Sequence, residues 1–140
     1  MPAITVEEFN TIIENELPFG RDLGMVADEI GHGHATVRVP YSDSMLRPGN
    51  TVAGPFMMGL ADACMYAAAL SLLGDVRLAV TTSFNINFLH RPSPADLIAE
   101  GRVLKLGKRL VVLEVTVHSA GHAEPVAHAT GTYSIPPNVP

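Results

Sequence analysis

The sequence predicts an α+β fold in which an antiparallel sheet of six strands wraps around one long central helix, with a short helix at the N-terminus. Three observations predict it. The 140 residues suffice for one domain, 1–140, and 47% of them are hydrophobic, so a large core can form. One apolar segment has helical length. The segments around it alternate between apolar and polar residues, as half-buried strands do.

The first element is a predicted amphipathic helix over residues 6–16. Thr5 and Glu8 have the spacing of a capping box, which satisfies free N–H groups at a helix start. One helix face carries the apolar residues Phe9, Ile12, Ile13 and Leu17. We expect this helix to end before Pro18, because the residue that precedes a proline avoids the helical conformation.

Two strands are predicted next, over 23–30 and 34–41. The tight turn between them contains Gly31-His32-Gly33, a glycine pair that suits a hairpin. Serine, aspartate, proline, glycine and asparagine then dominate residues 42–53, which are therefore predicted to form a loop.

The long helix is predicted to run from Gly54 or Pro55 to Leu73 and to stop at Gly74, a good C-terminal cap. Its length and apolar character would also suit a membrane span. Asp62 near its centre argues against that, because a carboxylate there costs about 2.5–3.5 kcal/mol on insertion scales. We therefore expect a buried core helix and no membrane association.

Four more strands are predicted over 78–89, 96–106, 109–119 and 125–135, with a turn at Gly107-Lys108. Six strands around a single helix leave open sheet edges, which usually require a covering partner. The sequence therefore predicts a homo-oligomer.

Composition excludes several classes of protein. The chain has 9 basic and 14 acidic residues and a formal charge of -5, the reverse of a general nucleic-acid binder. Its single cysteine, Cys64, cannot form an internal disulfide and is expected to be a buried, unreactive thiol. The first residues lack a signal-peptide pattern, so we expect a cytoplasmic protein. The six histidines have no metal-ligand spacing, so no metal site is expected.

Three segments carry a family resemblance: Leu46–Ala63, Asn85–Pro92 and the basic hairpin Val103–Val112. The first has a glycine at the start of the long helix and an aspartate eight residues later. Together they resemble the hotdog-fold acyl-CoA thioesterases, specifically the PaaI-like group, over about residues 15–135. The resemblance implies the hotdog fold and hydrolysis of an acyl-CoA, with coenzyme A as part of the substrate and no other cofactor. It also implies a homo-oligomer, with a dimer as the minimal unit and a tetramer as the favoured assembly.

The resemblance implies a role for each matching residue. Asp62 would act as general base or nucleophile, and Gly54 would give its backbone N–H to the thioester carbonyl. Thr81, or its neighbour Thr82, would hold the attacking water and would reach across from the partner subunit. Asn50 is a further candidate, although it lies nearer to the helix than the asparagine of those relatives.

The spacing of these residues predicts a site between subunits. Thioester hydrolysis builds negative charge on the carbonyl oxygen, which the N–H groups of a helix start can stabilise. Asp62 lies roughly 12 Å along the helix axis from Gly54, so two antiparallel helices would be needed to bring these groups together. One departure concerns Ala53, which stands where many relatives carry a histidine.

Further candidates for substrate binding lie outside the helix start. The basic candidates are Lys105, Lys108, Arg109, His90 and Arg91. They form either a solvated surface or a handle for the phosphates of coenzyme A. Met58 is expected to pack in the core or to line the acyl pocket. Asn85 is expected to bind solvent, substrate or a neighbouring strand.

Two rival functions stay open. A hotdog hydratase or dehydratase requires a catalytic histidine beside a carboxylate, whereas the long helix carries Asp62 and no histidine. A non-catalytic acyl-CoA-binding module would share the fold and lack turnover.

Overall fold

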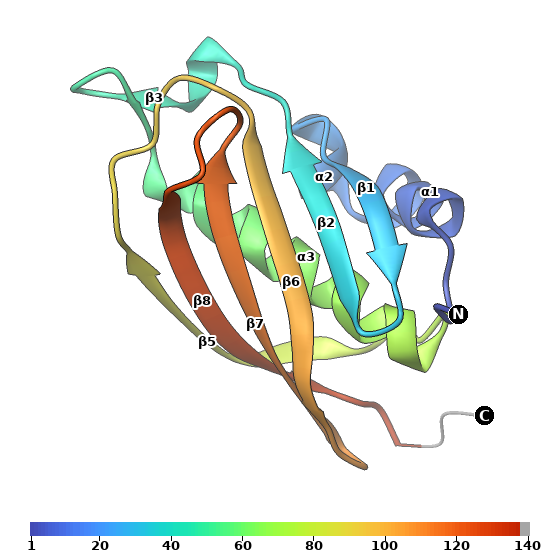
Figure 1. Ribbon diagram of the computed structural model, residues 1–140. Helices are drawn as coiled ribbons and strands as arrows, with labels where there is room; N and C mark the ends of the chain where they lie inside the picture. The colour runs from blue at the N-terminus through green and yellow to red at the C-terminus, as the bar shows by residue number, and fades with distance from the viewer. Residues whose placement is uncertain (138–140) are drawn as a thin grey trace.

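A computed structural model describes residues 1–137 (Figure 1). Six antiparallel strands form one curved sheet that wraps around the long helix α3, Gly54–Leu73. The strands lie in the order β1-β2-β6-β7-β8-β5 across the sheet. They are β1 Val26–Gly31, β2 His34–Val39, β5 Val80–Phe88, β6 Leu97–Leu106, β7 Leu110–Ser119 and β8 Pro125–Ser134. The predicted fold class is confirmed, and each strand lies within a few residues of its expected bounds.

The N-terminal helix α1, Val6–Glu16, forms as its capping box predicts. The Thr5 hydroxyl accepts the Glu8 N–H at 3.1 Å, and the Glu8 carboxylate accepts the Thr5 N–H at 3.0 Å. A second short helix, α2 (Pro18–Asp22), was not predicted. Pro18 stops the first helix but starts the second, because a proline at a first helical position sacrifices no hydrogen bond.

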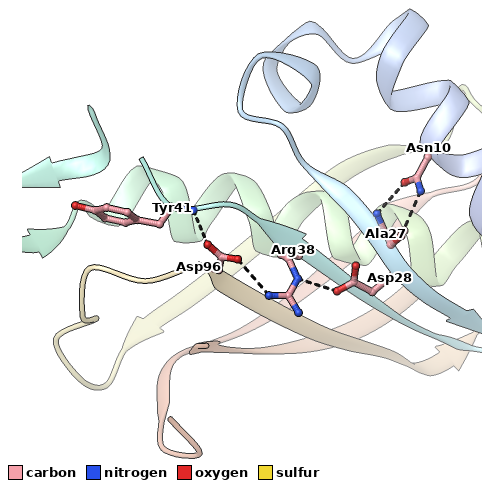
Figure 2. A network of polar contacts seen from close by, with 6 residues as sticks. All are labelled: Asn10, Ala27, Asp28, Arg38, Tyr41 and Asp96. Carbon is pink, nitrogen blue, oxygen red and sulfur yellow. Dashed lines mark hydrogen bonds and ion pairs between the residues drawn. The ribbon is translucent and has the colours of Figure 1, made fainter. Parts of the chain in front are cut away.

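Polar contacts fasten this end of the molecule to the sheet (Figure 2). The Asn10 side chain of α1 donates to the Ala27 carbonyl at 3.2 Å and accepts the Ala27 N–H at 2.8 Å. On the outer part of the sheet, Arg38 of β2 donates to Asp28 at 3.0 Å and to Asp96 at 3.3 Å. These contacts join α1, β1, β2 and the segment before β6, which are distant in sequence.

The predicted loop 42–53 contains more regular structure than expected. It holds a short 3₁₀ helix, Asp43–Met45, and a small hairpin of β3 (Leu46–Arg47) and β4 (Thr51–Val52). Each strand is only two residues long, which is too short for an alternating pattern to be recognised. Asn50 occupies the hairpin turn with φ 57°, a left-handed conformation that asparagine tolerates better than most residues.

The central helix α3 is the core of the fold, as predicted. It ends at Gly74, whose φ of 82° suits glycine. By length and composition the helix could also cross a membrane, but the sheet covers it and most of its residues are buried. Two glycines let the strands approach it closely. A Cβ on Gly101 would lie 2.9 Å from Cys64 Sγ, and one on Gly131 would lie 2.6 Å from Met65 Sδ.

Strand β5 forms one edge of the sheet. It is hydrogen-bonded to β8 and, within residues 1–137, to no other strand. Large apolar side chains are exposed on it or next to it: Leu78, Val80, Phe88 and Leu89. An open strand edge with exposed apolar side chains is a surface that soluble proteins usually cover with a partner.

Candidate active site

Asp62 is half-buried in the middle of α3, and two hydroxyl groups hold its carboxylate. Thr81 on β5 donates from Oγ1 to Asp62 Oδ1 at 2.7 Å. Tyr133 on β8 donates from Oη to the same Oδ1 at 2.8 Å and also lies 2.9 Å from the Asp62 carbonyl oxygen. The carboxylate is thus fixed between the helix and two adjacent strands.

A β-bulge decides which threonine contacts the carboxylate. Thr81 pairs with Tyr133 and Ser83 pairs with Thr132, so Thr82 is the extra residue on β5. The exposed Thr82 hydroxyl donates to the Thr132 carbonyl at 3.3 Å, away from Asp62. Thr81 reaches Asp62 of its own chain. The expectation that the threonine reaches across from a partner subunit is therefore wrong for this contact.

The second carboxylate oxygen of Asp62 is free. Within residues 1–137, no side chain donates a hydrogen bond to Asp62 Oδ2. This oxygen also keeps some solvent-accessible surface, since Ser119 Oγ is the one described side-chain oxygen or nitrogen that is fully buried without a partner. Oδ1 is therefore committed to the protein, whereas Oδ2 can take a water molecule or a substrate.

Tyr133 is a site residue that the sequence analysis missed. Its side chain is only 3% exposed, and its ring stacks on Tyr66 at 6.0 Å between centroids. Burial, reinforced by the Asp62 carboxylate, raises the pKa of the Tyr133 phenol well above its ordinary value, so the hydroxyl keeps its proton. One signal was present in the sequence. Gly131, Tyr133 and Ile135 alternate on the buried face of the last strand, and a buried tyrosine hydroxyl needs a partner.

A cavity of about 520 Å³ lies beside Asp62, and its other walls are mostly apolar. Residues from α2, α3 and β5 contribute to them, including Phe19, Tyr66, Ala79 and Val80. The Phe19 ring crosses α3 at Gly59, where a Cβ would lie only 2.4 Å from a ring carbon. The arrangement is an apolar cavity with one aspartate carboxylate in its wall.

Gly54 opens on a different cavity, of about 620 Å³. It is the first residue of α3, and its N–H makes no backbone hydrogen bond within residues 1–137. A Cβ here would lie 3.4 Å from the Phe88 ring, so a side chain at this position would press against that ring. Arg47, His90 and Arg91 also line this cavity. Gly54 and Asp62 of one chain therefore face separate cavities, as their spacing predicted.

The unpaired basic side chains gather at two places. Four of the nine lysines and arginines form ion pairs with carboxylates: Arg21, Arg38, Arg77 and Arg102. The other five form no ion pair with a described residue. Two of them, Arg47 and Arg91, lie in the Gly54 cavity. We call these two the cavity arginines. Lys105, Lys108 and Arg109 lie at the tip of the β6–β7 hairpin, which we call the hairpin cluster.

Within one chain these two basic groups lie at opposite ends of the sheet. The hairpin cluster lies next to the start of β5, since Leu110 and Val80 both pair with Ser134. His90 and Arg91 follow the other end of β5, about 25–30 Å away by the rise of a strand. Figure 1 shows the β6–β7 tip and the β3 hairpin at opposite ends of the molecule. The expectation that His90 and Arg91 join the basic turn is therefore wrong for a single chain.

Three other predicted residues lie apart from both cavities. Asn50 is exposed in the β3–β4 turn. Its left-handed backbone conformation accounts for an asparagine at this position. Met58 is 42% exposed on α3, one helical turn before Asp62. Asn85 is exposed on β5 opposite Thr130. None of them touches the Asp62 carboxylate.

Cys64 lies in α3 two residues after Asp62, yet it is fully buried. Its sulfur lies 3.5 Å from the carbonyl oxygens of Ala35 and Ala99. Burial raises the pKa of this thiol to about 12, so the thiolate is absent near neutral pH. The residues that the structure describes include no group of three or more His, Cys, Asp or Glu side chains that could hold a metal ion.

Comparison with known proteins places this geometry in context. Residues 49–126 match the thioesterase superfamily. The structure of a "putative thioesterase" from Silicibacter sp. TM1040 superposes with a TM-score of 0.88, is 37% identical and covers 98% of this chain and 95% of its own. A point mutant of the phenylacetic acid degradation protein PaaI from Thermus thermophilus has a TM-score of 0.72, 27% identity and coverage of 84% and 97%. A "putative esterase" of Saccharolobus solfataricus is 27% identical over 96% of this chain and 87% of its own length. The predicted hotdog fold and the resemblance to PaaI proteins are confirmed.

The burial of Cys64 predicts how the thiol responds to alkylation. Iodoacetamide at pH 8 should modify the folded protein at least 100-fold more slowly than the chain unfolded in guanidinium chloride, because burial in the folded protein covers the thiol and keeps it protonated. Mass spectrometry over a time course measures both rates. Equal rates in the two states would show that the thiol is accessible and that our description of it is wrong.

Proposed function

The chain belongs to the thioesterase superfamily, and on that premise we propose that it hydrolyses an acyl-CoA to a free acid and coenzyme A at a site shared by two chains. Family membership supports thioester hydrolysis in general. The observation that carries the more specific proposal is the hydrogen bonding of the Asp62 carboxylate. Two hydroxyl groups hold one carboxylate oxygen, and the other is left open beside an apolar cavity.

In the proposed reaction, Asp62 Oδ2 takes a proton from a water molecule as that water attacks the thioester carbon. A carbon–oxygen bond forms, the carbon–sulfur bond breaks, and the leaving thiolate of coenzyme A takes up the proton that Asp62 accepted, which restores the carboxylate. The Thr81 hydroxyl donates its hydrogen bond to Asp62 Oδ1, so the lone pairs of its oxygen can accept a hydrogen bond from the same water. Direct attack by Oδ2 on the carbonyl is the alternative route, and it needs the same open oxygen. Neither route uses a cofactor beyond the coenzyme A of the substrate.

The carbonyl oxygen requires a donor that the same chain cannot supply. Gly54 has a free N–H at the positive end of the α3 dipole, but it faces its own cavity. Two chains joined antiparallel along their β5 edges would place Gly54 of one chain near Asp62 of the other. The exposed apolar residues along β5 support this contact. The proposed minimal unit is therefore a dimer, and two such dimers would form the tetramer that the resemblance favours.

The same dimer would reunite the basic groups. The cavity arginines lie at the Gly54 end of α3, and the hairpin cluster lies at the end of the sheet where Thr81 and Tyr133 pair. An antiparallel partner would bring one chain's cavity arginines toward the other chain's hairpin cluster. In a protein of charge -5, five unpaired cations around one opening favour a substrate with several phosphates. An acyl-CoA is such a substrate, because its coenzyme A part carries the phosphates.

The two rival functions make different predictions. A hydratase requires a histidine close to the carboxylate. Among residues 1–137 no histidine lines the Asp62 cavity, but His90 lines the Gly54 cavity that a second chain would contribute, so the distinction rests on activity: a hydratase would release no free thiol. A non-catalytic acyl-CoA-binding module would bind the same ligands and release no free thiol, so the assays below separate it from an enzyme.

The first test of the proposal is Asp62→Asn. The asparagine carbonyl can accept the hydrogen bonds of Thr81 and Tyr133, while its amide group takes the place of Oδ2. The fold should therefore survive, and turnover should fall roughly 10²–10⁴-fold because the proton acceptor is lost. Thiol release from a panel of aliphatic and aryl acyl-CoA substrates gives the rate, and a melting curve checks folding. Near-parental turnover in a folded variant would falsify this role of Asp62.

The second test concerns assembly. Light scattering at micromolar concentration should report a dimer or a tetramer, because the open β5 edge and the divided site both require a second chain. Leu78→Lys places a charge beside the exposed edge, outside both cavities, and should shift the population toward monomer with parallel loss of activity. Thr130→Lys, on the neighbouring strand β8, is the matched control and should leave the assembly intact. A folded 14.9 kDa parental monomer with full activity would contradict the proposal.

The third test reverses the charge of the hairpin cluster with Lys108→Glu and Arg109→Glu together. KM for an acyl-CoA should rise about 5- to 30-fold at low salt, as expected for two exposed charges, with little change in kcat. The effect should shrink as salt screens these charges. Arg21→Glu removes an exposed arginine outside both basic groups and serves as the control. An unchanged KM at low salt would mean that the hairpin tip is only a solvated surface.

A further inference from the structure

We propose that Tyr133 is a positioning residue, which together with Thr81 fixes Asp62 Oδ1 and thereby keeps Oδ2 pointed at the reacting water or thioester. The inference rests on the proposed function, in which Oδ2 is the reactive oxygen. It adds a residue that neither the sequence pattern nor the family resemblance singled out.

The contacts of Tyr133 restrain Asp62 at two points. The phenol oxygen lies 2.8 Å from Oδ1 and 2.9 Å from the carbonyl oxygen of the same residue. One fixed hydroxyl therefore spans the backbone and the side chain of Asp62. Thr81 approaches the same Oδ1 at 2.7 Å from the adjacent strand. With two donors on Oδ1, rotation of the carboxylate would break both hydrogen bonds, so the two oxygens keep distinct roles.

The core holds Tyr133 rigidly enough for this task. Its ring is buried between the sheet and α3 and stacks on Tyr66. Its backbone pairs with Thr81 on one side and Val111 on the other. Asp62 Oδ2, by contrast, has no hydrogen-bond donor among residues 1–137. A side chain whose rotamer is locked by packing is what precise orientation of a reacting group requires.

Few other charged groups lie near Asp62 and Tyr133. Among the titratable residues that line the same cavity, Tyr66 donates to the Arg77 carbonyl at 2.9 Å. The Arg77 guanidinium is engaged by Asp75 and Glu16. Val111 on β7 brings no charge. The hydroxyls of Thr81 and Tyr133 are therefore the direct partners of the Asp62 carboxylate among the described residues.

Tyr133→Phe removes the hydroxyl alone, and Tyr41→Phe is its matched control. The Tyr41 hydroxyl also donates to an aspartate carboxylate, Asp43 Oδ1 at 2.7 Å, and Tyr41 lines neither the Asp62 cavity nor the Gly54 cavity. In Tyr133→Phe we expect kcat to fall roughly 10- to 100-fold with KM within about twofold. Loss of a donor disfavours the ionised carboxylate, so the acid limb of the kcat profile should move to higher pH. Tyr41→Phe should move neither kcat nor the acid limb.

Combination with Asp62→Asn separates this inference from the proposed function. If Tyr133 acts through Asp62, adding Tyr133→Phe to Asp62→Asn should cost no further activity. A parental kcat and pH profile in Tyr133→Phe, with Asp62→Asn inactive, would overturn the inference and leave the proposed function standing. Full activity in Asp62→Asn would overturn the proposed function itself.

A second variant covers the case in which Tyr133→Phe does not fold. Replacement of Tyr133 by 3-fluorotyrosine keeps the ring and its hydroxyl but makes the hydroxyl a stronger donor. The acid limb of the kcat profile should then move to lower pH, in the opposite direction to the phenylalanine variant. An unchanged profile in this folded protein would overturn the positioning role.

Discussion

The close wrapping of the sheet around α3 is the constraint on which the rest of the structure depends. Glycines at 101 and 131 allow strands β6 and β8 to approach within contact of Cys64 and Met65. A helix buried this deeply can carry a carboxylate only where that carboxylate is hydrogen-bonded, because an isolated buried charge is costly. The strands that close over the helix supply the donors, Thr81 and Tyr133. The same strands therefore close the core and supply the hydrogen-bond donors of the site.

Much of the architecture could be predicted because its signals are local. The capping box of α1, the apolar length of α3 and the alternation of the later strands each lie within one segment of the sequence. The exceptions have physical reasons. A proline that ends one helix can begin another, and strands of two residues leave no alternation to detect. Asp62 could be predicted as a candidate because a lone carboxylate in an apolar helix conflicts with its surroundings.

The partners of Asp62 could not be predicted with the same certainty because they depend on register. One extra residue at the β5 bulge selects Thr81 over Thr82, and no sequence pattern marks that bulge. Alternation predicts that Tyr133 points inward, but not which group it meets across a separation of 71 residues. The basic residues show the same dependence on the fold. Shared charge suggested one cluster, whereas within a single chain the sheet separates them to its two ends.

The distance between Gly54 and Asp62 along one helix has a consequence for mixed assemblies. If two chains complete each site, every dimer has two sites, and each site takes its carboxylate from one chain and its N–H donor from the other. A chain damaged at Asp62 and a chain damaged at Gly54 would then pair to give one site with both defects and one site with none. Two inactive forms of the protein would complement one another inside a single molecule, with half of its sites restored.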